Sequence, residues 1–381
     1  MTALSGMTWD HPRGRAPLVA LASRSGSAGD TTVEWSARSL QAFADHPLEE
    51  LADRYDLLVI DHPHVPLVAA SGLLVPLDEQ DRSAELAVLE SESVGQSFAS
   101  YRFEGHVWAL PVDAAAQVSA HRPDLISEPP SRWEDVLELA SEGRVAWPAK
   151  PVDAMSSFLT LSAQRGEPVC SRPDRFVARE DGLAVLGLMH EMADAVDPRC
   201  LDMNPVEAAE MLASDGRVCY VPLAFGYVNY ARSGFRANRI AYRDVPEGAR
   251  GVRGSCLGGA GIAVSARSQD RSAAVDVACW LASAPVQRGD YYREGGQPAN
   301  AAAWEDPEVD ADSLGFFSGT RRTLEGAAVR PRHPGWLALQ EVVGDLVHAT
   351  LLRSIGDDEC LDRLDDERGR LMGGHVSTGS A

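Results

Sequence analysis

Residues 55–61 have the sequence YDLLVID, a continuous run of apolar side chains that ends at an aspartate. A strand that is apolar on both faces is typical of a sheet that helices cover on both sides. Residues 31–35 (TTVEW) have a strand pattern before it, and apolar residues recur at near-helical spacing over 39–53. This alternation predicts βαβ units, and therefore an α/β fold with mostly parallel sheets.

The rest of the chain continues this pattern. Residues 17–22 (PLVALA) are expected to open the first helix, and residues 105–112, continued by 117–121, to form a long strand. Small polar residues after Met372 predict a disordered tail. Further strands are expected at 145–147, 217–222 and 262–265, and further helices at 156–164, 183–196, 205–213, 271–284, 336–354 and 357–371.

Two helix starts carry capping signals. Ser131, with Glu134 three residues later, has the pattern of a capping box. Asn204 followed by Pro205 combines a favoured N-cap residue with proline at the first helical position.

Length and charge limit the class of protein. With 381 residues, 45% of them hydrophobic and 24% charged, the chain is globular and long enough for two cores. A net charge of −21 argues against nucleic acid and anionic membrane surfaces as partners. No apolar run approaches the roughly 20 residues of a membrane-spanning helix. We therefore expect a small-molecule ligand, no membrane association and a monomer.

The first residues, MTALSGMTWDHPRG (1–14), contain neither a basic segment followed by an apolar stretch nor a cleavage site of small residues. This predicts a cytoplasmic protein. The six cysteines form no CxxC pair, so a thiolate metal cluster is not expected. Cys219 and Cys279 lie in apolar runs and are predicted to be small buried hydrophobes. A Cys170–Cys200 disulfide remains an open alternative.

Three stretches in this order resemble the family 1 extracellular solute-binding proteins, the sugar-binding class of ABC import systems. They are YDLLVIDHPHVPLVAASGLLVPLDE (55–79), GHVWALPVDAAAQVSAHRPDLISEPPSRWEDVLELA (105–140) and LGGAGIAVSARSQDRSAAVDVACWLASAPVQRGDYYREGGQPANAAAW (257–304). The resemblance implies a two-lobed periplasmic-binding-protein-like type II fold that closes on a ligand between its lobes. It implies lobe one at 1–111 and 260–312, lobe two at 114–257 and 318–381, and hinges near 110–114, 257–260 and 312–318.

The chain departs from that family in two respects. The family is exported, whereas the N-terminus here has no leader pattern, and an ABC permease would be a partner only of an exported chain. The segments TWDHPRG (8–14) and DHPH (61–64) are also more charged than the walls of a sugar site. Both departures suggest a leader-less cytoplasmic variant.

Polar residues follow a strand-like segment at the very start of the chain, before Asp10, and the strand that ends at residue 60. The carboxyl ends of parallel strands meet at one edge of a sheet. Arg13 can hold a carboxylate or phosphate with two hydrogen bonds, and Asp10 and His11 can exchange a proton. An ordinary surface ion pair is the alternative. Asp61 and His62 are candidates for hydrogen bonding to a ligand.

Other residues expected near this edge of the sheet are a second histidine, a third aspartate and a pair of glycines. His64, with Asp61 and His62, could in principle bind zinc, but no fourth ligand is evident, and no metal is expected. Asp113, at the expected first hinge, is a candidate acceptor or base, with a turn cap as the alternative. Gly258 and Gly259 allow backbone to approach a ligand closely, but the GGAG segment lacks the GxGxxG pattern, so no nucleotide cofactor is expected.

The second half of the chain offers candidates of its own. Lys150, Asp153 and Ser156 begin a predicted helix whose N-terminus would favour an anionic ligand, with N-capping by Asp153 as the alternative. Tyr227 follows a buried strand and could stack on the ligand, although a core role is equally expected. Arg332 is a candidate contact from the C-terminal part.

These patterns leave two classes of function open. The first is a binding protein that closes on a small polar metabolite, anionic or polyhydroxylated. The second is a cytoplasmic lyase, dehydratase or isomerase of a carboxylated substrate, with Asp10, His11, Asp61, His62 and Asp113 as acid–base groups. A third possible function is that of a regulatory sensor whose closure is recognised by another protein. No catalytic signature such as GxSxG or HExxH is present in the sequence.

Overall fold

A computed structural model describes residues 2–22, 31–39 and 48–373 of the chain. The predicted tail lies outside these residues from position 374, as do residues 40–47 of the helix expected over 39–53. The chain divides into two compact units, which are described separately below. Unit 1 comprises residues 1–115 and 258–311, and unit 2 comprises residues 116–257 and 312–381.

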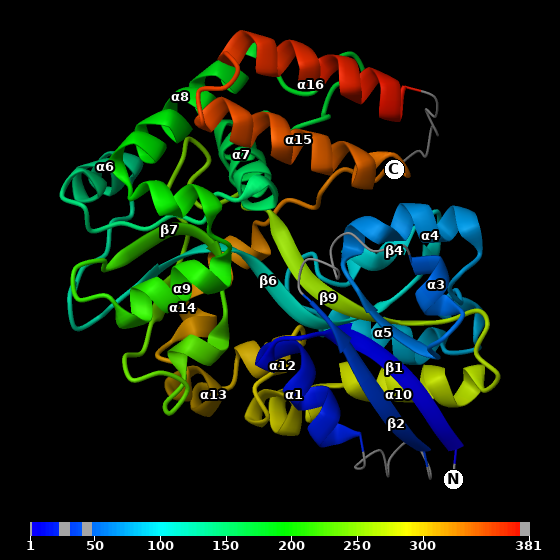
Figure 1. The fold of residues 1–381 in the computed structure, drawn as a ribbon. Coiled ribbons are helices and arrows are strands. Elements are labelled where there is room, and N and C mark those ends of the chain that lie inside the picture. The colour runs from blue at the N-terminus through cyan, green and yellow to red at the C-terminus, as the bar shows by residue number, and fades with distance from the viewer. Residues whose placement is uncertain (1, 23–30, 40–47, 374–381) are drawn as a thin grey trace. The chain divides into compact units, whose positions relative to one another are not determined.

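Unit 1 is built on a mixed sheet with the strand order β2-β1-β3-β9-β6 (Figure 1). Its strands are β1 (Thr2–Trp9), β2 (Thr31–Arg38), β3 (Leu57–Ile60), β9 (Leu257–Val264) and the first half of β6 (Leu110–His121). β1 pairs in parallel with both β2 and β3, as predicted for this part of the chain. β9 then joins β3 in the antiparallel direction.

Apolar side chains pack against both faces of this sheet, which explains why all four residues of β3 (57–60) are apolar. Leu57 and Val59 contribute to one core cluster, whereas Leu58 and Ile60 contribute to the other. Side chains alternate between the two faces of a strand, so a strand with two buried faces has no polar position. In its described residues, the helices of this unit are α1 (Pro12–Leu21), α3 (Leu48–Ala52), α4 (Val65–Ser71), α5 (Ser83–Ser91), α10 (Arg271–Ala282), α11 (Ala284–Val286), α12 (Ala301–Trp304) and α13 (Pro307–Asp312).

Two predicted boundaries in unit 1 were wrong. Helix α1 begins at Pro12 and not at residue 17, because the His11 side chain caps it: Nδ1 accepts a hydrogen bond from the Arg13 amide at 3.0 Å. Pro17 consequently lies inside the helix. The strand expected over 105–112 is divided into β5 (His106–Val107), which pairs with β4 (Arg102–Phe103), and the start of β6.

The sheet of unit 2 is formed by the second half of β6 with β7 (Tyr220–Phe225) and β8 (Ala241–Arg243). Both partners are antiparallel to β6, where mostly parallel pairing was predicted. The helices of this unit are α6 (Trp133–Ser141), α7 (Pro151–Arg165), α8 (Arg179–Ala195), α9 (Pro205–Ser214), α14 (Phe316–Glu325), α15 (Trp336–Leu351) and α16 (Asp357–Met372).

The capping signals in unit 2 had mixed outcomes. The N-cap at Asn204 with Pro205 at the first helical position is confirmed, because the Asn204 side chain accepts from the Glu207 amide at 2.9 Å. The Glu207 carboxylate also accepts from the Asn204 amide at 2.7 Å, which makes a capping box that was not predicted. The cap at Ser131 was wrong, since α6 has Arg132 at the N-cap position without a side-chain bond. The strand expected at 145–147 is a single bridge between Val145 and Tyr220.

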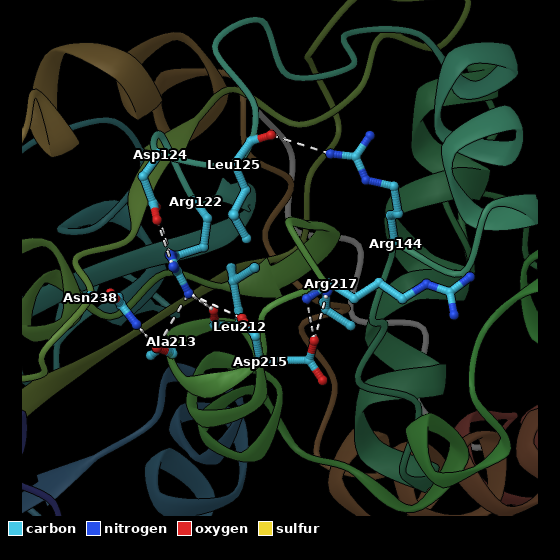
Figure 2. A network of polar contacts seen from close by, with 10 residues as sticks. Arg122, Asp124, Leu125, Arg144, Leu212, Ala213, Asp215, Arg217 and Asn238 are labelled. Atoms are coloured by element: carbon cyan, nitrogen blue, oxygen red, sulfur yellow. Dashed lines mark hydrogen bonds and ion pairs between the residues drawn. The ribbon is translucent and has the colours of Figure 1, made fainter.

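Arg122, directly after β6, holds the end of α9 in place. Figure 2 shows its guanidinium directed at the carbonyl groups of Leu212, Ala213 and Asp215, at distances of 3.0, 3.4 and 3.3 Å. The last carbonyl groups of a helix have no partner within it, so this arginine satisfies them. Asp124 holds the same guanidinium through two bonds of 2.7 Å.

The six cysteines all lie in the described residues and form no disulfide, so the Cys170–Cys200 alternative is not realised. Cys219 and Cys279 are buried as predicted. Among the residues that the structure describes, no helix combines the length and apolar character that a bilayer span requires.

Candidate functional site

Strand register in unit 1 brings the turns after β1 and β3 to one edge of the sheet. Met7 pairs with Leu58, so the two parallel strands end at the same level. Ile60 pairs with Gly261 of the antiparallel strand β9, so the beginning of β9 lies at that edge as well. We call this edge, with Asp10, His11, Arg13, Asp61, His62, Asp113 and Gly259, the strand-end site.

Arg13 and Asp113 are each other's partners within this site. Arg13 is 4% exposed and Asp113 is 2% exposed. The Arg13 Nε atom donates to Oδ2 of Asp113 at 2.7 Å, and Nη2 donates to Oδ1. The pair joins α1 to β6 in the two-bond geometry that only arginine provides. The guanidinium that the sequence suggested for an anionic ligand therefore neutralises an internal carboxylate.

The surroundings of Asp113 disfavour additional negative charge. Burial raises the pKa of the Asp113 carboxyl, while the charge and hydrogen bonds of Arg13 lower it and the charge of Asp61 raises it. Burial also raises the pKa of Tyr291 well above its usual value, and the charge of Asp113 adds to this effect. Asp113 thus lies within electrostatic reach of both Asp61 and Tyr291.

Asp61 remains partly exposed at the end of β3, with 18% of its side chain accessible. Its Oδ1 accepts from the His62 amide at 2.8 Å and caps a short 3₁₀ turn of residues 62–64. His64 Nδ1 lies 3.1 Å from the Asp61 carbonyl oxygen. His62 and His64 are both buried, and His62 packs edge-on against Tyr101 with ring centroids 6.5 Å apart.

The remaining acid–base candidates of the site have separate partners. Asp10 is exposed and pairs loosely with Arg15 at 3.4 Å. His11 uses Nδ1 for the cap of α1. The structure therefore brings the predicted residues to one edge of the sheet but does not pair Asp10 with His11 for proton transfer.

Tyr101 belongs to this region, and the sequence pattern did not identify it. Its hydroxyl donates to the Ile60 carbonyl oxygen at 3.2 Å, and its ring lies where a side chain at position 261 would be, 2.6 Å from a Cβ placed there. Glycine at 261 inside an otherwise apolar strand was the available signal, because it indicates close approach by another group.

In unit 2, Lys150 is the N-cap residue of α7, and Asp153 lies in the first turn of that helix. Lys150 Nζ pairs with Glu207 Oε2 at 2.9 Å, and the N-cap residue, Lys150, makes no side-chain cap. The alternative of capping by Asp153 is therefore not realised. Asp153 is 3% exposed, and its Oδ2 has no hydrogen-bond partner among the described residues. Burial raises the pKa of this carboxyl to about 8, with Lys150 opposing the shift and Glu207 adding to it.

The serines of α7 have internal roles. Ser156 donates to the Val152 carbonyl oxygen at 2.8 Å. Ser157 accepts from the indole of Trp147 at 3.2 Å and from Gln117 at 3.4 Å. The Ser156 bond lies within α7, and the bond from Gln117 to Ser157 joins α7 to β6.

Two further candidates lie elsewhere in unit 2. Tyr227 is buried at the start of a 3₁₀ turn of residues 228–231. Arg332 is half-buried, and burial lowers its pKa.

In the described part of the chain, no three His, Cys, Asp or Glu side chains are grouped so that they could hold a metal ion.

Residues 21–316 match the family of bacterial extracellular solute-binding proteins. The chain belongs to this family. Its fold is that of solved relatives: a maltose-bound protein of T. maritima has 18% identity and a TM-score of 0.83, covering 97% of this chain and 100% of that one. A solute-binding protein of Agrobacterium radiobacter in complex with ribitol has 17% identity and a TM-score of 0.80, and the match covers 97% of this chain and 98% of that one. A tagatose-bound ABC transporter solute-binding protein of Thermotoga lettingae has 16% identity and a TM-score of 0.83, covering 98% and 100%.

At these identities the structural likeness establishes the fold, which confirms the two-lobed α/β class predicted from the sequence. The family also corrects the predicted location. The prediction of a cytoplasmic protein was wrong, because members of this solute-binding family are extracellular. The first residues and the charged segments 8–14 and 61–64 are local features, whereas the family match rests on residues 21–316.

Proposed function

We propose that this solute-binding protein captures a neutral, polyhydroxylated small molecule of the sugar or polyol class. Three solved relatives with the same fold hold maltose, ribitol and tagatose, all of them neutral and rich in hydroxyl groups. Hydroxyl groups are recognised by carboxylate acceptors and by aromatic faces, and the chain contributes both types of residue.

The charge pattern favours a neutral solute over an anionic one. The two cations suggested for an anion, Arg13 and Lys150, are each paired with a carboxylate of the protein, Asp113 and Glu207 respectively. Transferring either cation to an anionic ligand would leave that carboxylate behind, and for the buried Asp113 the penalty is several kcal/mol. This pairing is the observation that carries the proposal.

Asp61 is the side chain to which we assign the first contact with the solute. It is ionisable, follows β3 directly and keeps part of its carboxylate accessible at the strand-end site. A carboxylate that accepts hydrogen bonds from two neighbouring hydroxyl groups gives orientation as well as affinity. Asp10, exposed at the same edge, is the second acceptor that this arrangement offers.

Given the extracellular family, we propose that the bound solute is handed to an ABC importer and that the protein acts as a monomer. Binding of the solute between the two units, and closure of the units on it, remain predictions. No observation favours the lyase, dehydratase or isomerase alternative, because Asp10, His11 and Asp113 have separate structural partners.

Mass spectrometry of small molecules released from the purified native protein tests the proposal. We expect a neutral sugar or polyol that rebinds the emptied protein with one-to-one stoichiometry. Asp61→Asn keeps the size of the side chain and should weaken that binding at least ~10-fold, because a charged acceptor contributes about 1.5–3 kcal/mol. The exposed Glu49→Gln variant on α3 should bind as the wild type does.

Release of an organic acid or a phosphate ester, rebinding at the same stoichiometry, would contradict the proposal. Equal affinities of the Asp61→Asn and Glu49→Gln variants would remove Asp61 from the site.

A further inference from the structure

Tyr101 lies against both chain neighbours of Asp61. It ends a 3₁₀ turn of residues 99–101 in unit 1 and is 2% exposed. Its hydroxyl donates to the carbonyl oxygen of Ile60 at 3.2 Å, and its ring meets the ring of His62 edge-on, with centroids 6.5 Å apart. One buried side chain therefore contacts the residue before Asp61 and the residue after it.

The space for the Tyr101 ring comes from a glycine on the neighbouring strand. Gly261 pairs with Ile60, and a Cβ placed on Gly261 would be 2.6 Å from the Tyr101 ring. A larger residue at position 261 would displace the ring. The Tyr101 backbone is fixed as well, because its amide donates to the Phe98 carbonyl and its own carbonyl accepts from the Trp108 amide, both at 3.0 Å. The ring and its hydroxyl are therefore held in one place.

His62 connects Tyr101 to the Asp61 carboxylate. The Oδ1 atom of Asp61 accepts from the His62 amide at 2.8 Å and lies 3.2 Å from Nδ1 of the His62 ring. The same ring packs against Tyr101. A carboxylate whose orientation is fixed before the solute arrives loses little conformational freedom on binding, and this raises affinity.

We propose that Tyr101 is a positioning residue of the solute site, which fixes the orientation of Asp61 through Ile60 and His62. This inference rests on the proposed function, in which Asp61 accepts hydrogen bonds from the solute. Removing the Tyr101 hydroxyl should therefore weaken solute binding by its effect on Asp61, beyond any loss of stability in unit 1.

Amide-proton NMR of the ligand-free, full-length protein tests the positioning role without a solute. The reporter is the His62 amide, whose hydrogen bond to Asp61 depends on the orientation of that carboxylate. In Tyr101→Phe, which keeps the ring, we expect an upfield shift of this resonance and hydrogen exchange at least ~3-fold faster than in the wild type.

Tyr292→Phe is the matched control for this measurement. Tyr292 is also buried in unit 1, and its hydroxyl also donates to a backbone carbonyl oxygen at 3.2 Å, that of Val309. The control removes the same kind of hydrogen bond, so it should cost similar stability but leave the His62 amide unchanged.

Calorimetric titration measures the consequence for binding in a double-variant cycle. Maltose, ribitol and tagatose, the solutes of the solved relatives, serve as probes. Tyr101→Phe should weaken binding ~3–10-fold, the effect of one hydrogen bond, whereas Tyr292→Phe should bind as the wild type does. In the Asp61→Asn background, Tyr101→Phe should have little further effect, because Tyr101 acts through the Asp61 carboxylate.

Equal behaviour of Tyr101→Phe and Tyr292→Phe, at the His62 amide or in affinity, would overturn the proposal. A Tyr101→Phe loss of the same size in the wild-type and Asp61→Asn backgrounds would also overturn it, because a purely structural role gives that result.

The two proposals can fail separately. Normal binding by Asp61→Asn would reject the contact between Asp61 and the solute, while the His62 amide would still report whether Tyr101 orients the carboxylate. Weakened binding by Asp61→Asn together with normal binding by Tyr101→Phe would reject the positioning role alone.

Discussion

Gly259 lies directly against the backbone of Asp113. A Cβ placed on Gly259 would be 2.4 Å from the Asp113 carbonyl oxygen, and φ of Gly259 is +107°. The beginning of β9 therefore approaches β6 at the very residue that pairs with Arg13. Only glycine permits both the backbone conformation and the contact.

Gly259→Ala should destabilise the protein by about 2 kcal/mol or more, since it adds both a clash with backbone and an unfavourable φ. Urea unfolding followed by circular dichroism measures the change. Gly187→Ala is the control: this residue lies inside α8 with nothing within 4 Å of an added Cβ, so the substitution should stabilise by up to ~1 kcal/mol. Equal effects of the two variants would show that β9 and β6 do not approach each other as described.

Arg13→Met should destabilise unit 1 by about 3–5 kcal/mol, because it leaves the buried Asp113 carboxylate unpaired. The double variant Arg13→Met/Asp113→Leu removes both charges and should recover much of that loss in urea unfolding. In the single variant Asp113 loses the partner that lowers its pKa, so its pKa rises further above that of the unfolded chain. Stability of this variant is therefore greatest below the usual carboxyl pKa and falls as pH rises. A double variant as unstable as the single one would argue against a buried ion pair.

Strands of unit 1 could be predicted from the sequence where the pattern of apolar residues along the strand matches the faces that are buried in the fold. The run Leu57–Ile60 is apolar because both faces of β3 are covered, so its pattern determines its environment. The antiparallel pairing of β7 and β8 with β6 could not be predicted, because a buried strand is apolar in either direction. The start of α1 was missed because a histidine cap is not among the favoured N-cap residues.

Asp153 should make the stability of unit 2 depend on pH. Burial raises the pKa of this carboxyl to about 8, whereas the unfolded chain releases the proton near 3.8. The stabilising contribution is complete below pH 4 and is lost as pH rises to about 8. Asp153→Asn does not titrate, so relative to the wild type it should become more stable by several kcal/mol between pH 4 and pH 8.

Urea unfolding of both proteins at pH 4, 6 and 8 measures this difference, with the exposed Asp135→Asn variant on α6 as the control. A difference in the free energy of unfolding between the wild type and Asp153→Asn that stays constant across this pH range would contradict the burial of an unpaired Asp153 carboxyl.

The candidate site was less predictable than the fold, for a physical reason. Strand ends indicated which turns meet, and the register of β1, β3 and β9 brings those turns to one edge. The sequence could not show that Arg13 would be neutralised by a residue 100 positions away. Long-range partners determine whether a charged side chain is free for a ligand, and they follow from tertiary packing.

Isothermal titration calorimetry of the emptied protein with matched solutes tests the central claim most directly. The pairs are ribitol against ribitol 5-phosphate, and glucose against gluconate. We predict that the higher affinity belongs to the neutral member of a pair, because the Arg13 and Lys150 cations are already paired within the protein. Tighter binding of the anionic member in both pairs, lost in the Arg13→Met variant, would contradict the account.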